Sequence, residues 1–243
     1  MKKVLAFDLG ASNLRWGIFE GEKLTSKNKV KTEKDPLSQI SCIIKDHIKD
    51  VEAIGLGMPG PLNFKGGVIL NPPNIPELSK TPLKQILAKN FGKPIFLDND
   101  ANCALQGEAW KGAATGLKNA VMLTLGTGIG SGILINGKIY RGATGAGAEL
   151  GHIIVMSNEN YEDLEKLIQN DHENQAEYLK IAIHNIQKIF EPEAIILGGG
   201  WAEKVIKPLT NYGKQLGVNI KLAELDEWAG VYGAAKGALE LTS

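Results

Sequence analysis

Apolar residues in the first half of the chain occur in short runs that are separated by glycine, proline and polar turns. The runs from Val4 to Phe7 and from Leu14 to Phe19 flank a turn at Asp8-Leu9-Gly10, and a third run follows Glu20-Gly21-Glu22. Short runs joined by such turns predict a three-stranded β-meander. Beyond it, the spacing predicts alternating helices and strands: a helix from Pro36 to Ile48, a strand at 51–56, a loop at 59–76 with a short strand at 68–70, a helix from Thr81, a strand at 94–97 and a helix at 101–110.

The same order begins again in the second half. The run from Ala120 to Leu125 ends at Gly126-Thr127-Gly128, and Asn136-Gly137 separates two further apolar runs, which is a strong hairpin signal. The rest of the chain is predicted as helices at 161–169 and 175–190, a strand at 194–197, a helix, a strand at 218–222 and a last helix from about 228. Placing Gly10 on Gly126 aligns the two strand–turn–strand units, so we expect two related α/β lobes with a ligand cleft between them.

The division into lobes follows from this repeat. We expect an N-terminal lobe at residues 1–107 and a C-terminal lobe at 108–229, with the last helix, 230–243, packed back on the N-terminal lobe. Because helices alternate with strands, both sheets should be covered by helices.

Composition narrows the classes of function. Lys+Arg and Asp+Glu both total 27, so the sequence does not indicate the cationic surface that nucleic acid binding needs. No apolar stretch approaches the length of a membrane span. Cys42 and Cys103 form no metal or redox motif, which is typical of a protein of the reducing cytoplasm. We therefore expect a cytoplasmic protein that binds neither nucleic acid nor membrane.

The turn after the first strand is a candidate phosphate site. Gly10 allows a ligand to approach closely, and Ser12, Asn13 and backbone N–H groups can donate to phosphate oxygens. Asp8 can hold a hydrated Mg²⁺. The alternative is an ordinary hairpin with an Asp-capped turn.

A second candidate phosphate site begins at Gly126-Thr127-Gly128. Glycine recurs at every other position from there to Gly132, with hydroxyl side chains between. A strand gains nothing structurally from so many glycines, so the close approach of a ligand explains them better.

Two further segments carry acid–base and hydrogen-bonding groups. Asp98-Asn99-Asp100 stands at the junction of a strand and a helix, where simple N-capping is the alternative. A cap needs one such residue, and a carboxylate there can also accept a proton from a substrate hydroxyl. Glu149 and His152 follow a glycine-rich turn and can bind neighbouring sugar hydroxyls; a partial metal site is the alternative.

Taken in order, these segments resemble the ROK family (repressor, open reading frame, kinase), which includes bacterial glucokinases and N-acetylmannosamine kinases. The resemblance covers nearly the whole chain. The matching motifs are Asp8 to Arg15, Gly57-Met-Pro59-Gly60-Pro61 with Pro73-Asn74-Ile-Pro76, Asn99-Asp100-Ala101-Asn102-Cys103-Ala104, Gly126 to Gly132, Glu149-Leu-Gly151-His152, Gly198-Gly199-Gly200, and Gly230-Val-Tyr-Gly233-Ala-Ala235.

The resemblance implies a fold, a cofactor and a set of roles. The fold is the two-lobed actin-like ATPase (ribonuclease H-like) fold with an interlobe cleft, and the phosphoryl donor is ATP with Mg²⁺. The family's general base follows the Asn of its motif, which favours Asp100 over Asp98. The implied ligands are Asn99, Glu149 and His152 for the sugar, and Gly199 and Gly200 on the adenosine side. We also expect a homodimer.

The sequence departs from the family pattern after His152. The family's E-x-G-H is commonly followed by a zinc motif of closely spaced cysteines, but no cysteine occurs after Cys103, so we expect no structural zinc. The zinc motif normally runs into a Leu-Glu whose Glu binds the sugar. Leu164-Glu165 is the candidate replacement and Glu162 its rival, and either can instead be solvated helix surface.

The leading hypothesis is ATP-dependent phosphorylation of a hexose, with glucose first and N-acetylmannosamine or another amino sugar next. A non-catalytic sugar or nucleotide sensor would not need Asp100, and a filament-forming ATPase of the actin class would not need Glu149 and His152. The family's repressors carry a helix-turn-helix ahead of the position of Val4. The sequence shows no helix-turn-helix before Val4, so we expect an enzyme rather than a repressor.

Overall fold

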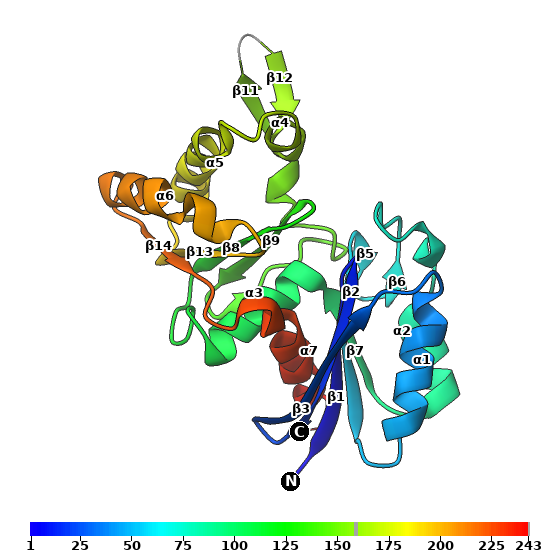
Figure 1. The fold of residues 1–243 in the computed structure, drawn as a ribbon. Coiled ribbons are helices and arrows are strands. Elements are labelled where there is room, and N and C mark those ends of the chain that lie inside the picture. Colours follow the sequence, from blue (N-terminus) through cyan, green and yellow to red (C-terminus); the bar gives the residue numbers. More distant parts are fainter. Residues whose placement is uncertain (158–159, 243) are drawn as a thin grey trace.

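The computed structural model describes residues 1–157 and 160–242 (Figure 1). The first half contains β1 (Lys3–Leu9), β2 (Asn13–Glu20), β3 (Lys23–Lys31), α1 (Pro36–His47), β4 (Ala53–Met58), β5 (Leu62–Asn63), β6 (Val68–Ile69), the 3₁₀ helix η1 (Pro76–Leu78), α2 (Leu83–Phe91), β7 (Ile95–Asn99) and α3 (Asp100–Lys111). The second half contains β8 (Ala120–Leu125), β9 (Ile129–Ile135), β10 (Lys138–Ile139), η2 (Leu150–His152), β11 (Ile154–Ser157), β12 (Asn160–Asp163), α4 (Leu164–Asn170), α5 (Gln175–Phe190), β13 (Ala194–Gly198), α6 (Ala202–Leu216), β14 (Asn219–Leu222), η3 (Asp226–Trp228) and α7 (Ala229–Glu240).

The two main sheets have the same topology, which confirms the predicted internal repeat. The first has the strand order β3-β2-β1-β4-β7 and the second β10-β9-β8-β13-β14. In both, the central strand pairs antiparallel with the next strand in the chain and parallel with the strand after the crossover. The predicted alignment of Gly10 on Gly126 therefore places β1 on β8.

Alternating side chains of the central strands pack into different cores. In β1, Leu5, Phe7 and Leu9 face the core under α1 and α2, whereas Val4 and Ala6 face α7. In β8, Val121, Leu123 and Leu125 face the core that the sheet shares with α5 and α6. Ala120 and Met122 face the core on the other side of the sheet. Strand side chains alternate between faces, so each sheet is buried on both sides.

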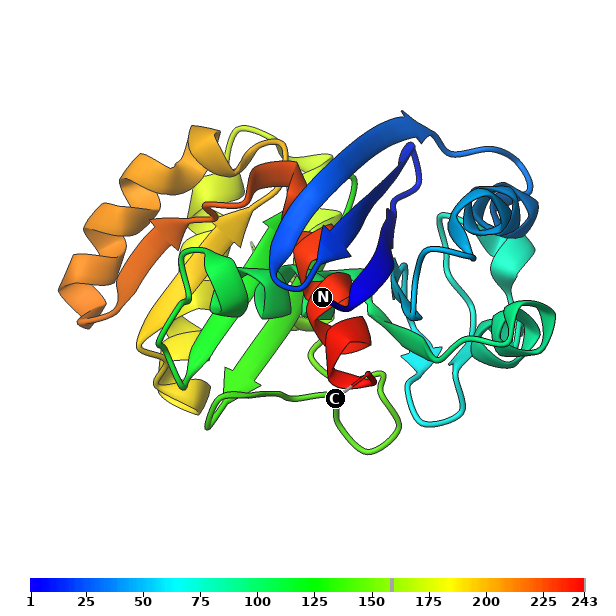
Figure 2. The ribbon, with the colours of Figure 1, turned by 90° about the horizontal axis from the view of Figure 1, so that it is seen from below.

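Helices α3 and α7 lie between the two sheets (Figure 2). Small residues allow their close approach: a Cβ at Gly233 would collide with the Cys103 carbonyl of α3, and a Cβ at Gly55 of β4 would collide with the Ala234 carbonyl of α7. The last helix thus packs on β1 and β4 of the first sheet as well as on α3. The beginnings of α3 and α7 are thereby brought to the space between the sheets.

Some predicted boundaries were wrong. The strand expected at 51–56 lies at Ala53–Met58, and the helix expected from residue 161 is preceded by a hairpin, β11–β12, that was not predicted. Helix α4 begins only at Leu164 because the Asp163 carboxylate accepts hydrogen bonds from the Glu165 and Lys166 N–H groups and so caps it.

None of the helices in the described part of the chain is long and apolar enough to cross a membrane.

Candidate active site

A cavity of about 610 Å³ lies between the two sheets, and the turns after β1, β8 and β13 line it together with the first turns of α3 and α7. Most residues predicted to bind nucleotide are among its lining: Asp8, Gly10, Ser12, Asn13, Gly126, Thr127, Gly199 and Gly200. The cavity is thus formed at corresponding ends of the two repeated sheets, where a ligand can contact both.

The two glycine turns have related geometry. The Gly10 N–H donates to the Asn13 carbonyl at 2.9 Å, and the Gly126 N–H donates to the Gly128 carbonyl at 3.0 Å. A Cβ at Gly126 would meet no atom closer than 4.0 Å, so packing within the protein does not require glycine there. Room for a ligand explains it better, as the sequence suggested.

The later glycines of the second turn lie in close contact with other parts of the protein. Gly130 and Gly132 belong to β9, and side chains there would collide with Ala101 and neighbouring atoms of α3 or the sheet. Gly128 does not line the cavity; a Cβ there would come within 2.6 Å of Glu165 Oε2. Close packing against α3 and against Thr124 of β8 explains the glycines of β9.

Asp100 is the first residue of α3 and lines the cavity. Burial raises the pKa of its carboxyl to about 7, with smaller contributions in the same direction from the charges of Asp8 and Glu149. Its side chain accepts a hydrogen bond from the Ala101 N–H at 2.8 Å. A carboxyl with a pKa near neutrality and an open face suits a general base.

Asp98, the other candidate base, has structural hydrogen-bond partners. It is fully buried and accepts hydrogen bonds from Arg141 Nε (2.8 Å), Asn102 Nδ2 (3.1 Å) and the Asn99 N–H (2.8 Å). Burial raises its pKa, and Arg141 opposes the rise. Asp98 therefore holds the Arg141 segment against β7 and α3, and does not line the cavity.

The residues predicted to bind a sugar gather beside Asp100. Asn99 caps α3 through Oδ1, which accepts from the Ala101 and Asn102 N–H groups. A Cβ at Gly60 would lie 2.7 Å from Asn99 Nδ2 and 3.8 Å from Glu149 Oε1, so both side chains border the same small space. Burial raises the pKa of Glu149, the charge of His152 opposes the rise, and that of Glu165 adds to it.

Glu165 also belongs to this group. Its Oε2 accepts a hydrogen bond from the Ile129 N–H at 2.6 Å, which ties α4 to β9. The charges of Glu165 and Glu149 both contribute to raising the pKa of His152. The structure thus brings Glu165 to Glu149 and His152, whereas no contact within the described part of the chain places the rival Glu162 with them.

The profile of the ROK family matches residues 4–162. The chain belongs to the ROK family. The glucokinase of Thermotoga maritima is 38% identical over 164 residues, which are 64% of this chain and 52% of that protein. The xylose repressor of Caldicellulosiruptor bescii is 35% identical over 115 residues, which are 47% of this chain and 28% of the repressor. The aligned segments thus span about half or less of these two relatives.

The ROK hexokinase structure from Thermus thermophilus is 31% identical to this chain, with a TM-score of 0.83 and 99% of each chain covered. This agreement confirms the expected actin-like ATPase fold. The family thus contains both enzymes and repressors, so membership alone does not decide the activity of this chain.

Three contacts at this ROK site were not predicted. Ser131, expected among phosphate-binding hydroxyls, donates to the Ala148 carbonyl and accepts from the Leu150 N–H, and so holds the backbone on both sides of Glu149. His152 Nδ1 lies 2.8 Å from Asp163 Oδ2. The partners are 17 and 19 residues apart for Ser131 and 11 apart for His152, and no local motif connects them.

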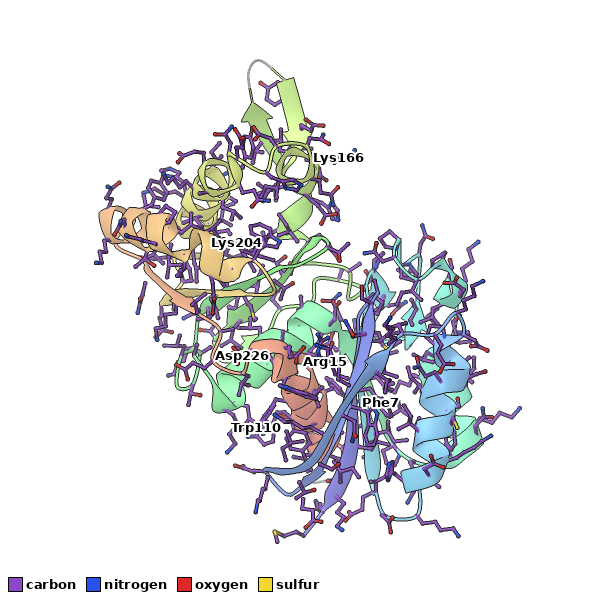
Figure 3. All side chains as sticks on the ribbon, viewed as in Figure 1. Phe7, Arg15, Trp110, Lys166, Lys204 and Asp226 are labelled. Carbon is purple, nitrogen blue, oxygen red and sulfur yellow. The ribbon has the colours of Figure 1, made fainter. Side chains whose placement is uncertain are left out.

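The third contact involves Arg15, which lines the cavity. Its Nε and Nη2 atoms donate to Glu227 Oε2 at 3.1 and 2.9 Å, and Lys29 also pairs with Glu227. Figure 3 places Arg15 and Asp226 beside the beginning of α7. One sequence signal was available: Arg15 and Arg141 are the only arginines among 27 basic residues, and both bind carboxylates here.

The cavity fits a magnesium ion at Asp8. Burial raises the pKa of this carboxyl to about 6, and Arg15, with Nη1 3.8 Å from Asp8 Oδ2, opposes the rise only in part. Arg15 thus compensates only part of the cost of burying the Asp8 charge, and a cation can compensate the rest. Mg²⁺ prefers carboxylate oxygens as ligands and usually keeps several of its waters. A Cβ at Gly230 would lie 2.6 Å from Asp8 Cγ, so the start of α7 leaves room for the carboxylate.

Proposed function

We propose that the chain is an ATP-dependent kinase that phosphorylates a hydroxyl of a hexose, with glucose as the first candidate substrate. The observation that carries the proposal is the position of Asp100. It lines the cavity with the two glycine turns, and it is near enough to Glu149 for that charge to raise its pKa. A base there lies between a nucleotide and a sugar. The glucokinase relative supports glucose; N-acetylmannosamine or another amino sugar is the alternative.

The nucleotide phosphates would bind at the turns of Gly10 and Gly126. Backbone N–H groups and the hydroxyls of Ser12 and Thr127 donate to phosphate oxygens there. Asp8 would hold magnesium through water, and the bound ion would neutralise charge on the phosphates. The adenosine would extend toward the turn after β13, at 199–200, which lines the same cavity.

The sugar would bind beside Asp100. Asn99 can donate from Nδ2 because its Oδ1 already caps α3. Glu149, His152 and Glu165 hold neighbouring hydroxyls through their oxygen and nitrogen atoms. These contacts orient one hydroxyl toward Asp100, and such positioning supplies much of the rate acceleration in phosphoryl transfer.

In the chemical step, the Asp100 carboxylate accepts the proton of that hydroxyl. The hydroxyl oxygen forms a bond to the γ-phosphorus while the bond from this phosphorus to the β–γ bridging oxygen breaks. ADP leaves with that oxygen, and the sugar carries the phosphoryl group. The neutral form of Asp100 then loses its proton to solvent as the site opens.

A second candidate function is a sugar-responsive regulator without catalysis, which the xylose repressor relative favours. A regulator needs the sugar ligands but no base. The raised pKa and open face of Asp100 support the kinase.

A coupled ADP-release assay with MgATP and a panel of hexoses and acetylamido-hexoses tests the proposal. We expect turnover with at least one sugar. Calorimetric binding of a sugar without turnover of any would overturn the kinase and favour the regulator. The expected homodimer stays a prediction, which light scattering can test.

A further inference from the structure

Asp163 connects two of the candidate sugar ligands. It ends β12, the second strand of the hairpin that projects from the C-terminal half (Figure 1). One carboxylate oxygen, Oδ1, accepts from the Glu165 N–H at 3.0 Å and the Lys166 N–H at 3.3 Å, and so caps α4. The other, Oδ2, lies 2.8 Å from His152 Nδ1. The two oxygens thus have separate partners on two segments.

We propose that Asp163 is a positioning residue that fixes the proton of His152 on Nδ1 and presents Nε2 to a sugar hydroxyl. This inference rests on the proposed sugar site. An ionised carboxylate accepts hydrogen bonds only, so the Nδ1 atom facing it must be the donor. The other ring nitrogen of neutral His152 is then an acceptor.

The surroundings of His152 agree with this assignment. Its side chain is 55% exposed, whereas that of Asp163 is only 16% exposed, so the carboxylate is the better-held partner. Hydrogen bonding to Asp163 raises the pKa of His152 most, and the charges of Asp163, Glu165 and Glu149 act in the same direction against partial burial. No charged group other than these carboxylates contributes to the shift among the described residues.

The same carboxylate sets Glu165. By capping α4, Asp163 fixes the first turn of the helix that carries Glu165, and Glu165 in turn accepts from the Ile129 N–H. A single residue therefore determines the orientation of His152 and the starting point of the Glu165 helix. A carboxylate that is hydrogen-bonded to a ligand-binding histidine commonly fixes the tautomer and the ring orientation of that histidine.

The Asp163→Asn variant separates these two roles. Asn is as good an N-cap as Asp, so α4 keeps its cap through Oδ1. The amide nitrogen then takes the place of Oδ2 and donates to His152 Nδ1, which moves the ring proton to Nε2. Asp163→Ser keeps a capping hydroxyl and removes the contact with the ring. The Glu173→Gln variant, at an exposed carboxylate between α4 and α5, is the matched control.

Two measurements test the proposal. Long-range ¹H–¹⁵N correlation of the imidazoles, above the pKa of His152 and with its signals assigned by their loss in His152→Gln, should show the Nδ1–H form in the wild type and the Nε2–H form in Asp163→Asn. Calorimetry above the pKa of His152, with the sugar that the wild type binds, should show a Kd raised about 5- to 150-fold in Asp163→Asn, since a sugar hydroxyl loses its acceptor. The control should match the wild type in both.

The outcomes separate this inference from the proposed function. An Nε2–H form in the wild type, or an unchanged sugar Kd in Asp163→Asn, would overturn the role of Asp163. A wild type that binds a sugar but does not turn it over would overturn only the kinase, because both measurements can be made without catalysis. A wild type that binds none of the sugars would overturn both.

Discussion

Arg141 Nε donates a hydrogen bond to Asp98 Oδ2 at 2.8 Å, and the Asp98 side chain is completely buried. The Arg141 guanidinium also stacks over the Phe64 ring, with 4.2 Å between its central carbon and the ring centroid. Arg141 follows β10, whereas Asp98 is the last residue but one of β7, so this pair joins the two repeated halves of the protein. Asp98 also accepts a hydrogen bond from the N–H of Asn99, the residue that precedes Asp100.

We predict that Arg141→Met destabilises the fold by about 3–5 kcal/mol, because it leaves the Asp98 carboxylate buried without its partner. Urea unfolding of the variant, with exposed Lys89→Met as the control, measures the difference. The loss should grow with pH, since burial raises the pKa of Asp98 and removal of Arg141 raises it further. A loss below about 1 kcal/mol would show that Asp98 is compensated by Asn102 and the backbone alone.

We predict that Asp100→Asn folds and binds the sugar but turns over about 10²–10⁴ times more slowly, the usual cost of losing a general base. An amide cannot accept the hydroxyl proton, although it preserves the shape of the side chain. Turnover and sugar Kd should be measured together, with exposed Asp46→Asn as the control. Turnover within threefold of the wild type would instead favour Asp98, or positioning alone.

The same carboxyl predicts how stability depends on pH. Its pKa is about 7 in the folded chain and near 3.8 when unfolded, so between these values the folded state binds more protons. Its stabilising contribution is therefore present below the unfolded pKa and is lost as pH rises through the folded pKa. Asp100→Asn cannot ionise, so it should melt at a higher temperature than the wild type at about pH 8 and at a similar one at about pH 4.

Melting curves without nucleotide and with a chelator check this expectation, because a bound cation would compensate the carboxylate and hide the effect. A variant that melts below the wild type at about pH 8 would mean that the ionised carboxylate, a stronger acceptor of the Ala101 N–H than an amide oxygen, gains more from that hydrogen bond than it loses by burial.

Local sequence patterns predicted the repeated sheets, because the continuous apolar runs before Gly10 and Gly126 reflect burial on both faces of β1 and β8. The strand–helix junction indicated Asp98 and Asp100 as candidate bases, and the resemblance to the ROK family favoured Asp100, whose role as the base stays a prediction. They did not predict β11–β12, since Ile154 and Tyr161 are 61% and 79% exposed and give no buried stripe.

Long-range pairs were also missed. Arg15 and Glu227 are 212 residues apart, and Arg141 and Asp98 are 43 apart, so only the folded topology brings them together. The rarity of arginine in the chain indicated that Arg15 and Arg141 have particular roles, but it did not identify their carboxylate partners.

We predict that the purified protein contains no structural zinc. Cys42 is exposed on α1 and Cys103 is buried in α3, and within residues 1–157 and 160–242 no group of three or more potential ligand side chains is placed to hold a metal ion. Asp163 is already bound to His152 and to the start of α4. Elemental analysis should find less than one zinc per chain, and a chelator should leave the melting temperature unchanged; one tightly bound zinc per chain would contradict this.

We predict that the lobes, which we propose to be residues 1–107 and 108–229, close when sugar binds. The two phosphate turns belong to different sheets, and His152 is 55% exposed although a phosphoryl-transfer site must exclude water to avoid hydrolysis of ATP. Closure would bury His152 and strengthen its hydrogen bonds to the sugar, because electrostatic interactions are stronger when water is removed. Small-angle scattering should show a smaller radius of gyration with a confirmed substrate than without it. His152→Ala, which weakens sugar binding, should need more sugar to reach the same compact state, whereas an unchanged radius in the wild type at saturating sugar would show that the cleft is already closed.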